Sequence, residues 1–162
     1  MSEILANDLR TQYGKMFNSI HGIVETFPED RWLEPHGDVY YIPCRMAYHL
    51  AAVIDKQVAG GIKDKDFAAK LPYGNWIEAK ACDLPDRNEF LAYFDGVLGR
   101  AGKALALVTD EGLAAPIEPE RAWMGASQLG AHLYIMRELA AHTGELNKML
   151  IENGKEDIWY FK

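Results

Sequence analysis

The chain contains 162 residues, of which 49% are hydrophobic and 25% charged, and it carries a formal net charge of −7 at pH 7. This length predicts a single domain over residues 1–162, large enough to bury an apolar core. The negative charge argues against nucleic acid as a partner, because phosphate binding requires a basic face. The sequence also lacks an apolar run of about 20 residues and a basic amphipathic segment, so we expect no membrane partner.

Two features bear on the compartment in which the protein works. The first residues have neither the basic start nor the apolar stretch of a signal peptide. The cysteines, Cys44 and Cys82, are too few for a disulfide framework and do not form a CxxC motif. We therefore expect a cytoplasmic protein.

The first third of the chain predicts two helices separated by a loop. Apolar residues three and four positions apart predict a helix from Ser2, as its N-cap, to about Phe27. Residues 29–41, which include Trp32 and Tyr40, predict an ordered aromatic loop. A second helix is expected from Pro43, a residue suited to a first turn, to about Val58, where two glycines follow.

The middle of the chain predicts a long crossover and then a third helix. Residues 62–84 contain the turn signal Pro72-Tyr73-Gly74-Asn75 and no extended helical periodicity. The third helix is expected to start near Pro85, with Asp83 or Asp86 in the capping region, and to reach about Val108. Three small residues within it favour close contact with another helix: Gly96, Gly99 and Gly102.

The last third predicts a connector, a long helix and an aromatic tail. Residues 109–121 form the connector, and the helix is expected from about Ala122 to Asn153. The tail, residues 157–161, is aromatic enough that we expect it to pack on the helices or on a partner subunit. No segment shows the alternation of a strand, so the fold class is all-α, and a four-helix bundle is the economical architecture.

The last helix contains a pair of side chains suited to metal binding. Glu138 and His142 are four residues apart and therefore lie on one helical face, with His142 inside an apolar stripe. His49 lies at the margin of the apolar stripe of the second helix. Two imidazoles and one carboxylate would form a three-ligand site with open positions. A buried Glu–His hydrogen bond without a metal is the alternative.

Two segments resemble signatures of the DinB/YfiT-like family of metal-binding four-helix bundles. Pro43-Cys44-Arg45-Met46-Ala47-Tyr48-His49-Leu50 resembles the second-helix signature, and Arg137-Glu138 through His142-Thr143-Gly144-Glu145-Leu146-Asn147 resembles the fourth-helix signature. The order of the elements is also similar. The resemblance implies a bundle with a long crossover between its second and third helices.

The resemblance also implies a divalent cation, zinc or nickel, held by His49, Glu138 and His142. The family usually has histidine where this chain has Glu138. A carboxylate adds negative charge and a harder ligand, so manganese or iron becomes more suitable than in an all-histidine site.

The function implied by the resemblance is that of a metal-dependent enzyme, a thiol S-transferase or a hydrolase. In such an enzyme the metal activates a low-molecular-weight thiolate or a water molecule. No catalytic residue is identified beyond the ligands. Arg45, one turn before His49, is a candidate to bind an anionic substrate, or else forms a salt bridge to a neighbouring helix. Glu145, one turn after His142, is a candidate to support that ligand or relay a proton, or else faces solvent.

Other interpretations remain open. The protein could be a non-catalytic, stress-associated or dimeric interaction protein whose His/Glu cluster is structural. A second apolar stripe faces away from His142 and predicts a homodimer under either hypothesis: Leu129, Leu133, Met136 and Ala140. Two histidines and a carboxylate also suit an Fe(II) oxygenase, although the usual scaffold of those enzymes is a β-barrel. We expect His132 to be a hydrogen-bonded interface residue and His36 to make a loop contact.

Overall fold

The computed structural model describes residues 3–38 and 41–159, in which the protein is all-α and contains no β-strand. Ser2, Tyr40 and the last residues of the aromatic tail lie outside the described ranges. The α-helices are α1 (Ile4–Thr26), α2 (Pro43–Val53), α3 (Arg87–Ala106), α4 (Asp110–Ala114) and α5 (Gln128–Glu152). Short 3₁₀ turns occur at Glu29–Arg31, Gly61–Lys63, Phe67–Lys70, Ala81–Asp83 and Pro119–Met124, and a π turn at Ile54–Val58.

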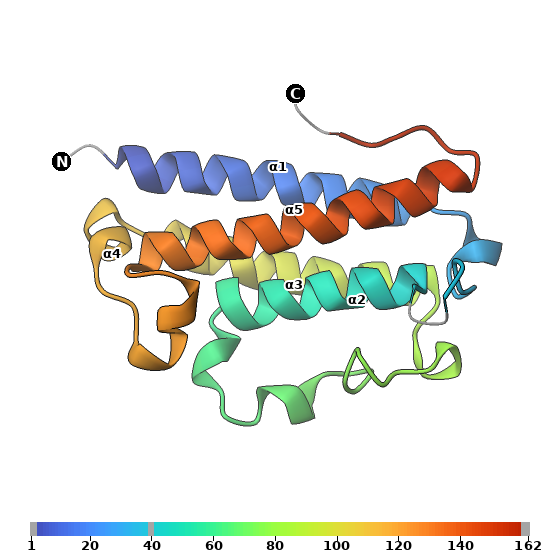
Figure 1. Cartoon of the computed structure of the whole chain (residues 1–162), viewed down its shortest axis with the longest axis horizontal. Coiled ribbons are helices and arrows are strands. Elements are labelled where there is room, and N and C mark those ends of the chain that lie inside the picture. Colours follow the sequence, from blue (N-terminus) through green and yellow to red (C-terminus); the bar gives the residue numbers. More distant parts are fainter. Residues whose placement is uncertain (1–2, 39–40, 160–162) are drawn as a thin grey trace.

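The long helices lie side by side (Figure 1) and enclose one apolar core. Helix α1 packs against α3 and α5, and α2 packs against the same two helices from the other side. Fully buried side chains from each helix meet between them, among them Ile20, Leu50, Phe94 and Ile135. This arrangement brings the middle of α2 against the middle of α5. None of the described helices combines the length and apolarity needed to cross a bilayer.

The second helix follows the sequence-based prediction closely. Pro43 occupies its first turn, and the π turn Ile54–Val58 continues it to the expected end. Gly60 then adopts φ +92°, the left-handed conformation that glycine provides at the end of a helix.

The last helix starts later than predicted. The Ser127 hydroxyl accepts a hydrogen bond from the Gly130 amide at 3.3 Å, so Ser127 is the N-cap and Gln128 the first helical residue. The expected first turn from Ala122 belongs instead to the 3₁₀ turn Pro119–Met124. The backbone of Gly125 approaches α5 so closely that a Cβ on Gly130 would lie 3.1 Å from the Cα of Gly125.

The third helix confirms one prediction and corrects another. Asp86 is the N-cap, and its carboxylate accepts from the Glu89 amide at 2.8 Å. The prediction of close contact at Gly96, Gly99 and Gly102 is wrong, because all three are exposed. A Cβ at Gly99 or Gly102 would meet no atom within 4 Å among the described residues. These glycines lie on the outer face of α3, away from the buried stripe.

The segments between the helices are anchored to helix ends and faces. The Trp32 indole is buried and donates to the Pro85 carbonyl at 3.2 Å, which holds the aromatic loop on the start of α3. In the crossover, residues 59–86, the Gly74 carbonyl accepts from the Tyr48 hydroxyl at 3.0 Å. The tail returns to α5, where the Ile158 amide donates to Asn147 Oδ1 at 3.0 Å. The expected packing of the tail on the helices is thus seen for Ile158.

Two glycine-to-alanine substitutions test this account of the backbone contacts. Gly130→Ala places a methyl group against the Gly125 backbone and should lower the free energy of unfolding by roughly 1–2 kcal/mol. Gly99→Ala, in open space on a helix, should raise it by roughly 0.5–1 kcal/mol. Urea denaturation measures both, and equal stabilisation by the two substitutions would contradict the close approach at Gly130.

Candidate metal centre

The structure brings His49, Glu138 and His142 together between α2 and α5. Glu138 Oε1 lies 3.4 Å from His49 Nε2 and 3.2 Å from His142 Nε2. The two imidazole rings have centroids 4.7 Å apart and are nearly perpendicular. One potential ligand atom from each residue lies within 4.8 Å of the others, so the group could hold a metal ion.

His49 is the most enclosed member of this cluster. Its side chain is only 8% exposed, and the Trp76 ring covers it with a centroid separation of 3.9 Å. Burial lowers the pKa of His49, and the neighbouring His142 lowers it further, whereas Glu138 and Glu145 act in the opposite direction. The lowered pKa keeps His49 neutral at neutral pH, and a neutral imidazole is the form that binds a metal.

His142 is oriented from its other side by Glu145. The distance between His142 Nδ1 and Glu145 Oε2 is 2.7 Å, a short hydrogen bond between residues one turn apart on α5. If the single N–H of a neutral imidazole is at Nδ1, it donates to Glu145, and the lone pair of Nε2 faces Glu138. A carboxylate that fixes a ligand histidine in this way is typical of protein metal sites.

The donor atoms suit a cation better than they suit each other. With Nδ1 protonated, His142 Nε2 and Glu138 Oε1 are two acceptors facing each other across 3.2 Å. Neither nitrogen of His49 has a hydrogen-bond partner of normal geometry in the described part of the chain, although both are buried. Ligands about 2.1 Å from a tetrahedral ion lie about 3.4 Å apart, close to the two Glu138 separations. The residues present therefore fit a divalent ion.

The surroundings of the cluster include aromatic residues that sequence analysis could not place. Trp76, from the crossover, covers His49. On the Glu138 side, Trp123 and Tyr134 line a small cavity of about 130 Å³ together with Glu138 itself. Glu138 and His142 are 32% and 24% exposed, so the cluster is reached from the surface on this side. The sequence predicts Trp76 and Trp123 in the core or in the wall of a pocket, and it does not distinguish these two positions.

The other candidate residues have different partners. Arg45 is buried and its guanidinium donates to the Ala79 carbonyl, which ties the crossover to α2; its role toward a substrate stays a prediction. His132 Nδ1 lies 3.0 Å from the Tyr13 hydroxyl, which confirms a hydrogen-bonded interface residue. His36 forms an ion pair with Glu152, a loop contact as expected.

No family model, no curated protein and no solved structure matches the chain. The interpretation of the site therefore rests on its own residues and their geometry.

Replacing Glu145 tests its contribution to the site. Glu145→Gln removes the charged acceptor for His142 Nδ1, and we expect the affinity for Zn²⁺ to fall by about 10- to 100-fold. Competition with a chromophoric chelator measures this affinity. Glu111→Gln, an exposed position on α4, removes the same charge elsewhere and should leave it unchanged. Equal affinities for all three proteins would show that Glu145 has no part in the site.

Proposed function

We propose that the protein is a divalent-metal-dependent enzyme of the DinB/YfiT-like type, in which His49, Glu138 and His142 hold the metal. One observation carries the proposal: potential ligand atoms of three side chains converge on one point between α2 and α5. Without a cation, His142 Nε2 and Glu138 Oε1 would face each other as acceptors, and the His49 nitrogens would lack a partner. The packing of α1, α2, α3 and α5, with a long crossover between α2 and α3, supports a four-helix bundle of this type.

Each residue of the site has a distinct part in this proposal. His49 supplies a neutral imidazole that is shielded from water by Trp76. Glu138 supplies the negative charge and is the ligand nearest to the small cavity. His142 completes the set, and Glu145 fixes its orientation and can accept a proton from a group bound nearby. A divalent ion bound here would lower the pKa of a thiol or a water molecule in an open position.

A thiol S-transferase or a hydrolase is the reaction class that we propose. Glu145, at 43% side-chain exposure, lies where a proton could pass between the site and solvent. The group that could hold the ion consists of two histidines and one glutamate, so the metal would activate a nucleophile from outside the chain, a thiol co-substrate or water. A low-molecular-weight thiol fits this requirement. The single carboxylate ligand makes manganese or iron candidates beside zinc and nickel.

Metal loading tests the central part of the proposal. Protein purified without a histidine tag should contain about one divalent ion per chain by elemental analysis. Adding Zn²⁺, Ni²⁺ or Mn²⁺ at 100 times its Kd to metal-free protein should stabilise it by about 2.7 kcal/mol, a rise in Tm of roughly 5–10 °C. His142→Ala should lose both effects.

A matched histidine provides the control for this experiment. His21 lies on α1 and is paired with Asp95 at 3.2 Å, away from the cluster. His21→Ala should therefore keep the metal and the rise in Tm. If wild-type protein carries no metal and its Tm does not respond to any of the three ions, the enzyme proposal is wrong.

We also propose that the protein forms a homodimer through the outer face of α5. On this face Leu133 is 56% exposed, and Leu129 and Met136 are only partly buried. Trp123, which is 65% exposed, packs its ring on Tyr134 beside the same face. Large exposed apolar side chains grouped in this way are typical of an association surface.

Sedimentation velocity tests the dimer. Leu133→Glu places a charge in the stripe and should convert a dimer into a monomer, because burying an unpaired carboxylate is unfavourable. Leu107→Glu is the control, since Leu107 is 82% exposed at the end of α3 and lies outside the stripe. A wild-type protein that sediments as a monomer at high concentration would rule out this assembly.

A further inference from the structure

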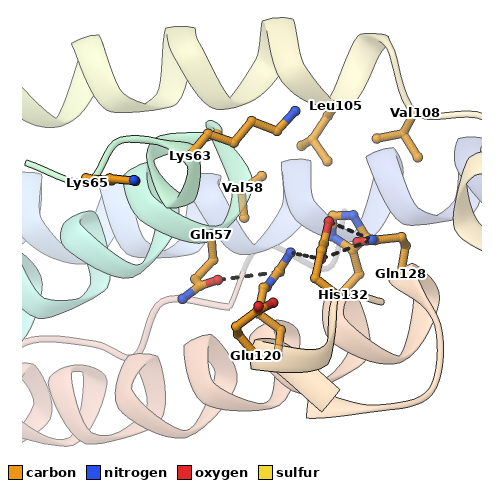
Figure 2. Close-up of a pocket in the computed structure, with 12 residues that line it drawn as sticks. Gln57, Val58, Lys63, Lys65, Leu105, Val108, Glu120, Gln128 and His132 are labelled. Atoms are coloured by element: carbon orange, nitrogen blue, oxygen red, sulfur yellow. Dashed lines mark hydrogen bonds and ion pairs between the residues drawn. The ribbon is translucent and has the colours of Figure 1, made fainter. Parts of the chain in front are cut away.

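A cavity bordered by the first turns of α5 is separate from the candidate metal centre. It has a volume of about 680 Å³, within the range of small-molecule sites. Its lining comes from three parts of the chain, Gln57 to Lys65, Leu105 to Val108, and Glu118 to His132, and Figure 2 shows side chains from all three facing one another. His132 lies ten residues before His142, about 15 Å along the helix axis, so the cavity is not part of the cluster.

The wall that carries Arg121 is held firmly against α5. The backbone N–H of Gln128 donates to the Ala115 carbonyl at 2.9 Å, and Pro116 and Ser127 form an isolated antiparallel β-bridge. The close approach of Gly125 to Gly130 fixes the other end of the same segment. The 3₁₀ turn Pro119–Met124 thus presents Arg121 toward Gln57 across the cavity. A wall fixed in this way suits a preformed binding site.

Arg121 is a partly buried cation whose contacts within the chain are long. Its side chain is only 15% exposed, and its contacts are long: 3.3 Å to Glu118 and 3.5 Å to Gln57. Its Nε has no hydrogen-bond partner in the described residues. A guanidinium has five N–H donors arranged to match a carboxylate, so this one retains capacity for an anionic group. Lys63 and Lys65 add two cations at the exposed side of the cavity.

The cavity also contains acidic and apolar groups. Glu118 and Glu120 lie on its lining. A hydrogen bond from its own backbone amide lowers the pKa of Glu118, and the Gln128 side-chain amide and the Arg121 charge lower it further, which keeps that carboxylate charged. Val58, Leu105 and Val108 supply an apolar surface from the opposite walls. His132 adds no charge at neutral pH, because burial and the Arg121 charge both lower its pKa.

We propose that this cavity binds a small zwitterion with an apolar side chain, an apolar amino acid or a short peptide. Arg121 and the lysines bind its carboxylate, the carboxylates of Glu118 and Glu120 bind its ammonium group, and Val58, Leu105 and Val108 contact its side chain. Such a ligand offers a complementary group to the cationic, the acidic and the apolar side chains of the lining. A simple anion would leave the acidic and apolar side chains without a complementary group. The proposal does not depend on the metal function.

A series of related compounds tests the proposal on full-length protein. The probes are leucine, 4-methylpentanoate, which lacks the ammonium group, 3-methylbutylamine, which lacks the carboxylate, and the dipeptide leucyl-leucine. Metal is removed first, so that no probe can coordinate an ion at His49 and His142. Calorimetry gives the affinities, and amide chemical shifts in NMR spectra locate the site. Leucine or leucyl-leucine should bind about tenfold or more tightly than either truncated compound.

Single variants separate the two charge contacts. Arg121→Gln should weaken the binding of leucine and 4-methylpentanoate by about tenfold or more. It should not weaken the binding of 3-methylbutylamine, because Glu118 keeps its carboxylate and loses a competing cation. Glu118→Gln should weaken leucine and 3-methylbutylamine but not 4-methylpentanoate. Arg137→Gln is the control, because Arg137 lies over the Tyr134 ring and does not line the cavity. If Arg121→Gln fails to fold, the exposed pair Lys63→Gln and Lys65→Gln, made together, provides the same test of carboxylate binding.

The outcomes distinguish the possible ligands. Tighter binding of leucyl-leucine than of leucine identifies a peptide site, and the reverse identifies an amino acid site; both support the proposal. Shifts confined to residues 57–65, 105–108 and 118–132 are expected. Equal binding of leucine and 4-methylpentanoate, no binding of either leucine or leucyl-leucine at 10 mM (on the order of the weakest specific sites), or shifts centred on the metal cluster would overturn it.

Discussion

Burial of the His49 imidazole between α2 and α5 is the constraint on which the candidate site depends. An imidazole in this position is costly to charge, and its nitrogens need partners that the surrounding apolar residues cannot supply. Glu138 approaches it at ion-pair distance, but the same carboxylate oxygen also faces His142. A single divalent ion would satisfy all three groups at once, whereas a single proton can bridge only one pair. The charge of the carboxylate and that of the ion would then partly cancel in a largely enclosed place.

Helix α5 carries two chemically different regions along its length. Its middle, from Glu138 to Glu145, holds two of the three candidate ligands and the carboxylate that orients His142. Its first turns border a roomy cavity with charges of both signs. Gln57, at the π turn that ends α2, lines the large cavity and also the small one beside Glu138. The antiparallel packing of α2 and α5 therefore places both regions along one seam of the molecule.

The parts of the fold and of the ligand group that follow from the geometry of a single helix could be predicted from the sequence. Glu138 and His142 share a face because helix geometry imposes it at a spacing of four. His49 could be proposed as a third ligand from its residue type and its place at the margin of an apolar stripe. Nothing local to a helix states which neighbour it will meet, and only a resemblance supported that pairing. The glycines of α3 show that small residues alone do not predict a helix contact. They allow close packing only on a helix face that a neighbour approaches, and these glycines lie on the outer face. Ser127 could have indicated the true start of α5, because a serine before a helical stripe is a good N-cap.

Trp76 illustrates what the sequence could not reveal. It lies in a crossover without long helices, and its position over His49 depends on the path of the whole segment. The close packing of Gly125 on Gly130, which shapes the large cavity, depends in the same way on the route of a connector.

The attachment of the crossover to α2 has a consequence for access to the metal centre. Arg45 and Tyr48 hold the crossover through the carbonyls of Ala79 and Gly74, and both precede His49 on the same helix by no more than one turn. Trp76 lies between those two attachment points and forms the cover of the imidazole. Releasing this short stretch would uncover His49 while the four long helices stay packed. Local unfolding of the crossover would therefore open a second route to the buried ligand, at a lower free energy than global unfolding.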